Sequence, residues 1–233
     1  MKKKIILDCD PGHDDAVAIM LATAHDDIEI LGITCVAGNA TLDNTKKNAL
    51  KVCSLIGATD LPIFAGAEQP LHYELVTAEH VHGKSGLDTE GQTINILEGY
   101  NIEEMHAVDF IINTCHRESE PIYLCPVGPL TNIALALQKD PTIKPKIKEI
   151  VFMGGASMCL GNITPAAEFN IYVDPHAANV ILNSGVKTVM IGLDVTHKVN
   201  VNDTIINDIK SNQNKSSILF ADLMNFYSKT HRR

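Results

Sequence analysis

The sequence lacks a hydrophobic run of the roughly 20 residues that a membrane-spanning helix needs. Near the amino terminus, only Ile5, Ile6 and Leu7 separate the basic residues 2–4 from Asp8. This stretch is too short for the hydrophobic region of a signal peptide, and no small-residue cleavage site follows it. We therefore expect a cytoplasmic protein without a membrane partner.

The cysteines form no C-x-x-C pair and follow irregular spacings. They are Cys9, Cys35, Cys53, Cys115, Cys125 and Cys159. Most lie within apolar segments, where a free thiol behaves as a small hydrophobic side chain. The pattern argues against a zinc site and a disulfide framework, and it indicates a reducing compartment.

Positive charge is scarce, because 19 Lys and Arg face 28 Asp and Glu, for a net charge of −9. A nucleic-acid-binding surface requires a basic patch, and beyond residues 2–4 the lysines are scattered. We expect small molecules or cations as partners and no nucleic acid. The 45% of hydrophobic residues suffices for a core in one domain of 233 residues.

Short β-branched segments alternate with helical patterns along the chain. The predicted strands are residues 4–8, 28–36, 62–65, 121–126, 149–153 and 188–193. The predicted helices are residues 14–24, 43–56, 102–115, 130–138, 175–183 and 201–210. Because the strands are apolar on both faces, helices should cover both sides of the sheet. This pattern predicts an α/β fold with an open, mostly parallel, doubly wound (Rossmann-like) sheet.

Polar or glycine-rich residues follow the predicted strands, at residues 8–10, 38–39, 126–128, 154–155 and 194. In open α/β sheets, ligands bind beyond the carboxyl ends of the strands, so we expect the functional site there. Residues 69–99 interrupt the alternation with several histidines and glycines. They form either a surface loop or a lid over the site.

Four carboxylates lie close together after the first strand, on Asp8, Asp10, Asp14 and Asp15. Any single one could serve only the amino-terminal end of the following helix. Four converging carboxylates instead need a cation, or some must stay protonated. Since no cysteine joins them, these oxygen ligands suit calcium or magnesium rather than zinc.

Two reaction types use such a site. One is phosphoryl transfer through an aspartate, and the other is hydrolysis by a metal-bound water. Phosphoryl transfer would favour a small hydroxyl residue soon after Asp10, where this chain has Pro-Gly-His-Asp-Asp.

Residues 8–15, DCDPGHDD, resemble the D-x-D-P-G-x-D-D signature of the nucleoside hydrolases, calcium enzymes that cleave the N-glycosidic bond of ribonucleosides. Four further segments resemble that family in the same order. They are ITCVAGNATLDNT (33–45), HGKSGLD (82–88), CPVGPLTNIA (125–134) and MGGASMCLGNITPAAEFNIYVDPHAA (153–178). The resemblance extends from the amino terminus to at least residue 194.

The resemblance implies a role for each matching residue. Asp10, Asp15 and the backbone carbonyl of Val127 would bind Ca²⁺, with Asp10 also acting as general base on the bound water. Asp8 would support these ligands without itself binding the ion. The remaining residues would contact the substrate, the ribose in most cases and the base in the case of His82: Asp14, Asn39, His82, Met153, Asn162, Glu168 and Asn170. Turn-forming roles for Asn39 and Asn162, and a surface position for His82, stay open as alternatives.

The family pattern continues with a distal histidine–aspartate pair, whereas His231 here precedes Arg232. We therefore expect a single nucleoside hydrolase domain over residues 1–233 that lacks the family's distal segment. A relic that binds calcium or ribose with little turnover is the alternative. The segment PVGPLTN resembles that of pyrimidine-preferring members of the family, which implies substrates such as uridine, and the family implies nucleoside salvage by a homodimer or homotetramer.

Overall fold

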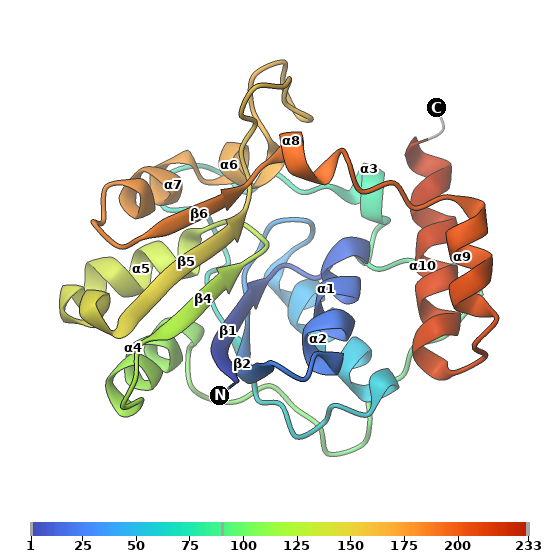
Figure 1. The fold of residues 1–233 in the computed structure, drawn as a ribbon, viewed down its shortest axis with the longest axis horizontal. Helices are drawn as coiled ribbons and strands as arrows, with labels where there is room; N and C mark the ends of the chain where they lie inside the picture. The colour runs from blue at the N-terminus through green and yellow to red at the C-terminus, as the bar shows by residue number, and fades with distance from the viewer. Residues whose placement is uncertain (1, 90, 232–233) are drawn as a thin grey trace.

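The computed structural model describes residues 2–89 and 91–231, and a single six-stranded sheet forms its centre (Figure 1). The strands are β1 (Lys3–Cys9), β2 (Ile28–Cys35), β3 (Ile63–Ala65), β4 (Ile122–Pro126), β5 (Ile147–Met153) and β6 (Thr188–Ile191). They are all parallel, in the order β3-β2-β1-β4-β5-β6. This order confirms the predicted Rossmann-like sheet, in which the connections reverse direction between β1 and β4.

Helices cover both faces of this sheet. They are α1 (His13–Ala24), α2 (Leu42–Ile56), α3 (Glu79–His82), α4 (Ala107–Arg117), α5 (Thr131–Lys139), α6 (Phe169–Val173), α7 (Pro175–Leu182), α8 (Leu193–Thr196), α9 (Asp203–Lys210) and α10 (Lys215–His231), with a 3₁₀ helix at Pro141–Lys146. No helix in the described part of the chain is long and apolar enough to cross a membrane.

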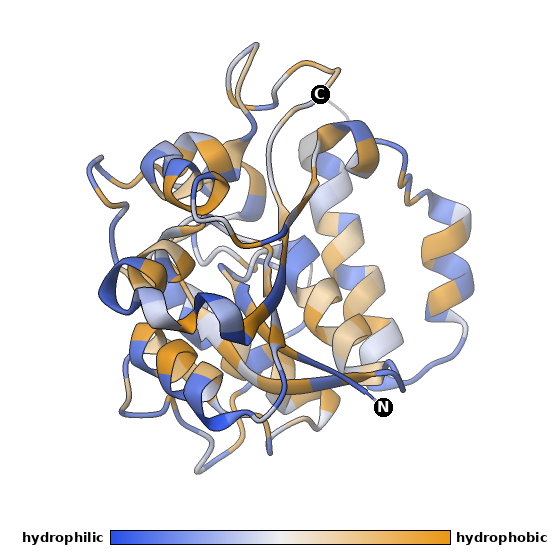
Figure 2. Cartoon of the chain, turned by 60° about the vertical axis from the view of Figure 1, so that its left-hand side comes forward, coloured by the Kyte–Doolittle hydropathy of each residue, from blue (hydrophilic) through white to orange (hydrophobic). Residues whose placement is uncertain are grey.

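Alternation along the strands divides the core into two layers. On β1, Ile5, Leu7 and Cys9 pack with α1, α2 and α10, whereas Ile6 packs with α4, α5 and α7. In Figure 2 the central strands are largely hydrophobic, and the surrounding helices alternate between hydrophobic and polar residues. Strands that are apolar on both faces explain why helices are needed on each side.

The cysteines are free thiols, as the sequence predicts. All of them lie in the described part of the chain. Four of them are buried: Cys9, Cys35, Cys53 and Cys115. They fill the core as small hydrophobic side chains.

Several predicted boundaries differ from the structure by one or more residues, and two of them for a local reason that can be named. The helix predicted from residue 102 begins at Ala107, because Glu103 forms a bridge with Phe64 of β3 and the His106 side chain caps the helix. The strand predicted to residue 193 ends at Ile191, because the next residue caps the short helix α8. Residues 69–99 are mostly irregular, as expected, and contain only α3 among the helices described there.

Candidate active site

The carboxyl ends of the strands carry the predicted site residues. In Figure 1 the arrowheads point toward the part of the molecule where α3, α6 and α8 lie. Asp10 and Asp15 follow β1, Asn39 follows β2 and Val127 follows β4, the direct neighbour of β1. The turn between β1 and α1 therefore lies at the topological switch point between β1 and β4, where this fold is expected to bind ligands.

Asp10 is fully buried just beyond β1. Its Oδ2 accepts a hydrogen bond of 2.6 Å from the backbone N–H of Asn39. Its Oδ1 is buried and has no hydrogen-bond partner among the residues that the structure describes. Glycine is required at positions 38 and 128, because a β-carbon at either would collide with this carboxylate. The surrounding backbone thus encloses Asp10 without satisfying its second oxygen.

Asp15, in the first turn of α1, is the second buried carboxylate of the site. Its Oδ2 accepts hydrogen bonds of 3.2 Å from the backbone N–H of Gly12 and from Nδ2 of Asn39. Its Oδ1 accepts a 3.4 Å hydrogen bond from the backbone N–H of Asp10. Asp14, on the same turn, is exposed. Asn39 therefore contacts both buried carboxylates and is more than a turn residue.

The two buried carboxylates disfavour each other's charge. Burial raises the pKa of Asp10 well above its usual range, and the charge of Asp15 adds to this shift. Burial also raises the pKa of Asp15 to about 8, with a contribution from Asp14. A cation between them would favour both ionised forms. Two carboxylates and the unpartnered oxygen of Asp10 therefore fit a hard, oxygen-liganded cation.

The expectation that all four carboxylates converge on one cation is wrong. The described residues contain no group of three His, Cys, Asp or Glu side chains placed to hold a metal ion. Asp8 instead accepts hydrogen bonds at Oδ1 from the Thr34 hydroxyl (2.6 Å) and from Nδ2 of Asn132 (2.8 Å). Burial raises the pKa of Asp8 to about 7 despite these two donors. Among the described residues, a third protein ligand beside Asp10 and Asp15 would therefore be an oxygen other than a carboxylate.

Asn132 was not singled out from the sequence, although it lies within the CPVGPLTNIA segment. Its fully buried side chain donates to Asp8 and, at 3.1 Å, to the backbone carbonyl of Cys35. Its Oδ1 accepts a hydrogen bond of 2.8 Å from the backbone N–H of Ala67. One side chain of α5 therefore joins the ends of β1, β2 and β3.

Beyond β4 and β5, Asn170 contacts two other predicted site residues, Val127 and Met153. Its Nδ2 donates to the backbone carbonyl of Val127 at 2.9 Å and to that of Met153 at 3.2 Å. The same nitrogen lies 3.4 Å from the sulfur of Met153. The structure thus brings the carbonyl proposed as a metal ligand next to two residues expected to contact ribose.

Glu168 caps the amino terminus of α6. Its Oε1 accepts from the backbone N–H of Asn170 at 3.0 Å, and its Oε2 accepts from Gly155 at 2.9 Å and Ile171 at 3.2 Å. Burial raises the pKa of Glu168 above its usual value, and the charge of Asp14 contributes. Asn162 is exposed, and its Oδ1 accepts a 2.8 Å hydrogen bond from the backbone N–H of Phe169. This contact fits the turn-forming role of Asn162, which the sequence analysis gave as an alternative to a ribose contact.

His82, at the end of α3, is buried rather than on the surface. Its ring stacks on that of His13, with centroids 5.3 Å apart, and lies 5.7 Å from the ring of Tyr227. Phe226 stacks on His13 at 5.0 Å. Sequence reasoning missed His13 and the two aromatic residues of α10, because their proximity depends on how α10 packs against α1 and α3.

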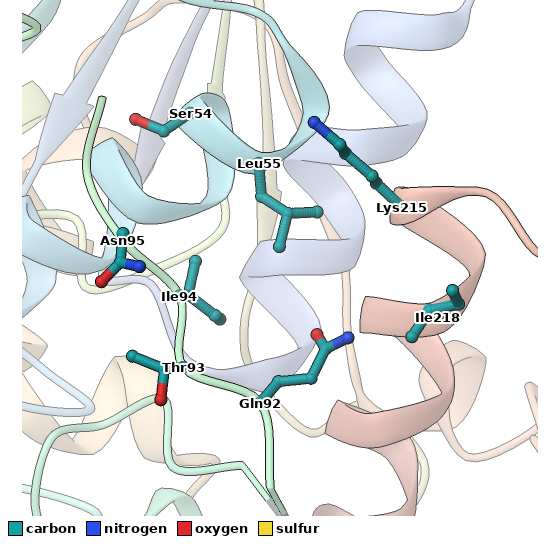
Figure 3. A pocket seen from close by; sticks show the side chains of 8 residues that line it. All are labelled: Ser54, Leu55, Gln92, Thr93, Ile94, Asn95, Lys215 and Ile218. Carbon is teal, nitrogen blue, oxygen red and sulfur yellow. The ribbon is translucent and has the colours of Figure 1, made fainter. Parts of the chain in front are cut away.

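A separate pocket of about 390 Å³ shares no residue with these groups (Figure 3). Its lining comes from the end of α2, from residues 92–95 and from the start of α10. In this fold, helices run opposite to the strands they connect, so the end of α2 lies at the amino-terminal edge of the sheet. The pocket is therefore remote from Asp10 and Asp15.

Together, these observations define a Rossmann-like α/β protein with buried carboxylates and amides gathered at the carboxyl ends of its strands. The sequence model of the family "Inosine-uridine preferring nucleoside hydrolase" matches residues 5–233. The chain belongs to this family.

The chain is similar to curated and structurally characterised relatives over nearly its whole length. It is 48% identical over 229 residues to the pyrimidine-specific ribonucleoside hydrolase RihB of Escherichia coli K12, which covers 98% of this chain and 72% of RihB. The solved structure of a purine-preferring ribonucleoside hydrolase from Gardnerella vaginalis superposes with a TM-score of 0.93 and 34% identity, covering 99% of this chain and 73% of that one. The solved structure of a plant nucleoside hydrolase, PpNRh1, gives a TM-score of 0.93 and 34% identity, and the match covers 100% of this chain and 73% of that one.

Proposed function

We propose that this protein hydrolyses the N-glycosidic bond of ribonucleosides, releasing ribose and the free base, with Asp10 as general base. The buried, unpartnered Oδ1 of Asp10 carries this proposal. An enclosed carboxylate oxygen with a raised pKa is suited to take a proton from water. The hydroxyl of that water bonds to C1′ of the ribose as the C1′–N bond breaks, and the base leaves with the bonding electron pair and takes up a proton from the solvent.

Asp10, Asp15 and the carbonyl of Val127 are the groups that would hold Ca²⁺. When bound, the ion would supply positive charge that lowers the pKa of a coordinated water and orients the ribose hydroxyls. The carbonyl of Val127 accepts one hydrogen bond, from Asn170, and a carbonyl oxygen has a second lone pair for a cation. This donor set of hard oxygens supports calcium over zinc.

The ribose cradle would comprise Asp14, Asn39, Glu168 and Asn170, with Met153 packed beside it. Asn39 and Asn170 lie against the proposed calcium ligands, so each would offer its amide group to a sugar hydroxyl. Negative charge on Asp14 and Glu168 would stabilise the positive charge that develops on the ribose as the bond to the base breaks. Asn162 is retained in this set on the family resemblance alone.

For the base, we propose pyrimidine nucleosides such as uridine. The support is the 48% identity to the pyrimidine-specific RihB, against 34% to the purine-preferring enzyme from Gardnerella vaginalis. The stacked rings of His13, His82 and Phe226 beside the acidic turn would give a flat base an aromatic surface. The proposal includes a role in salvage, a cytoplasmic location and a homo-oligomeric state.

The test is ribose release from uridine and inosine, with and without a calcium chelator, by the unaltered protein and by Asp10→Asn. We expect chelator-sensitive turnover of uridine that the substitution lowers by about 10²-fold or more, the usual contribution of a general base. Asp26→Asn, an exposed carboxylate in the turn before β2, is the matched control.

Two outcomes would contradict the proposal in different ways. Turnover that survives both chelation and Asp10→Asn would remove Asp10 and the cation from the reaction. Calcium-dependent stabilisation by ribose without ribose release would instead favour the alternative of a binding domain with little turnover.

A further inference from the structure

The pocket shown in Figure 3 is built from three segments that lie far apart in the sequence. It is lined by the end of α2, by residues 92–95 and by the start of α10. Its volume of about 390 Å³ lies within the range of roughly 300–1,000 Å³ that is typical of small-molecule sites. Its lining residues, all in the described part of the chain, do not include the acidic turn after β1. A ligand held there would therefore be distinct from the substrate of the proposed hydrolysis.

Hydrogen bonds within the protein hold the walls of this pocket in place. The Ser54 hydroxyl oxygen accepts a 2.9 Å hydrogen bond from the backbone N–H of Leu97, which ties the irregular segment to α2. Ile94 of that segment is buried in the core. At the start of α10, Oδ1 of Asn214 accepts from the backbone N–H of Ser217 at 2.8 Å, and Oγ of Ser217 accepts from that of Asn214 at 3.1 Å. The pocket is thus preformed, and the amino terminus of α10 is already capped by its own side chains.

The amide of Gln92 is the first feature that indicates a ligand. Its Oε1 is buried and has no hydrogen-bond partner among the residues that the structure describes. In Figure 3 the side chain extends toward Leu55 and Ile218, into the space that they line. A buried acceptor without a partner is costly, and folded proteins contain few of them. An N–H group of a molecule in the pocket would satisfy this oxygen.

Lys215 gives the pocket a positive charge in a chain whose net charge is −9. Its ammonium group forms no ion pair with a carboxylate in the described part of the chain. An ammonium group attracts carboxylates and phosphates. One such group balances a single negative charge, so a carboxylate suits it better than a phosphate with nearly two. The pocket therefore favours a small monoanion.

We propose that this pocket binds a small cyclic carboxylate that also carries an N–H group. The ring packs against the apolar side chains of Leu55, Ile94 and Ile218. The carboxylate faces Lys215, and the N–H group donates to Oε1 of Gln92. This site goes beyond the proposed hydrolysis and does not depend on it.

Calorimetric titration with three probes tests each contact separately. Orotate combines a flat ring, a carboxylate and ring N–H groups, whereas uracil lacks the carboxylate and benzoate lacks the N–H groups. We expect orotate to bind with the highest affinity. Uracil should bind about two- to fivefold more weakly, because an exposed lysine contributes little to an ion pair. Benzoate should bind about tenfold more weakly, because it leaves the buried oxygen of Gln92 without a donor.

Two variants assign these differences to the pocket. Lys215→Gln should weaken orotate binding about two- to fivefold and leave uracil unchanged. Gln92→Met should weaken orotate about tenfold and leave benzoate unchanged. The matched control for charge is Lys210→Gln, at an exposed position at the end of α9, which should bind orotate as the unaltered protein does.

The stability of Gln92→Met without any probe provides a readout besides binding. Because the substitution removes an unsatisfied acceptor, the urea midpoint should stay unchanged or rise. A marked fall would show that this oxygen has a partner in the free protein and would overturn the proposal. So would the absence of orotate binding, or equal orotate binding by the unaltered protein and both variants. If Gln92→Met does not fold, the order of the three probes and the result for Lys215→Gln decide. None of these measurements involves ribose release, so their failure would leave the proposed hydrolysis intact.

Discussion

Replacing Asn132 with alanine tests whether one side chain holds three strand ends together. Asn132 is fully buried, and its amide donates to Asp8 and Cys35 and accepts from Ala67. Alanine leaves the Asp8 carboxylate, the Cys35 carbonyl and the Ala67 N–H buried and without the hydrogen bonds that Asn132 provides. Because the groups come from β1, β2 and the segment after β3, the loss affects the scaffold on which Asp10 and Asn39 are placed.

The magnitude follows from the chemistry of the three partners. A hydrogen bond to a charged group contributes about 1.5–3 kcal/mol, and each neutral one contributes about 1 kcal/mol. We therefore expect Asn132→Ala to lower the free energy of unfolding by about 3–5 kcal/mol, a large share of the roughly 5–15 kcal/mol typical of a domain. Asn132 also lowers the pKa of Asp8, which burial raises to about 7. The loss should therefore be greater at pH 8, where Asp8 is ionised, than at pH 5.

Urea unfolding with a chelator present, at pH 5 and at pH 8, measures this loss. The matched control is Asn113→Ala, at an exposed position of α4, which should change stability by no more than about 0.5 kcal/mol. A loss below about 1 kcal/mol for Asn132→Ala would refute the reasoning, because it would mean that water or a rearranged backbone satisfies the three partners. An equal loss at both pH values would refute the coupling to Asp8.

Three further predictions concern the carboxylates. Calcium should raise the melting temperature of the unaltered protein but not of Asp10→Asn, and an equal shift in both would contradict the assignment of this ligand. Because burial raises the pKa of Asp8 from 3.8 to about 7, its ionisation should lower the free energy of unfolding as pH rises through that interval. Asp8→Asn should flatten this part of the profile in urea titrations, and an unchanged slope would argue against it. Glu168→Gln should destabilise the protein by about 1–3 kcal/mol, since an amide nitrogen cannot accept from Gly155 and Ile171; an unaltered urea midpoint would refute this.

Much of the fold was predictable because its signals are local. Strands that are apolar on both faces and helices with a 3.6-residue period identify an α/β sheet without knowledge of any long-range contact. The pairing of Asp10 with Asp15 was predictable for a similar reason. The two residues lie five positions apart on one tight turn between β1 and α1, so their proximity follows from the turn itself.

Other parts of the site could not be predicted, because they depend on segments that meet only in the folded chain. Asp8 belongs to the same short acidic stretch, yet its carboxylate turns to Asn132, 124 positions away, because that amide reaches β1 from α5. His82 meets His13 across 69 positions, through the irregular path of residues 69–99. Side-chain partners of this kind depend on loop paths and helix packing, for which a local pattern of hydrophobic residues carries no signal. The sheet and its acidic turn thus follow from local patterns along the chain, whereas the groups that this turn faces depend on how distant segments pack.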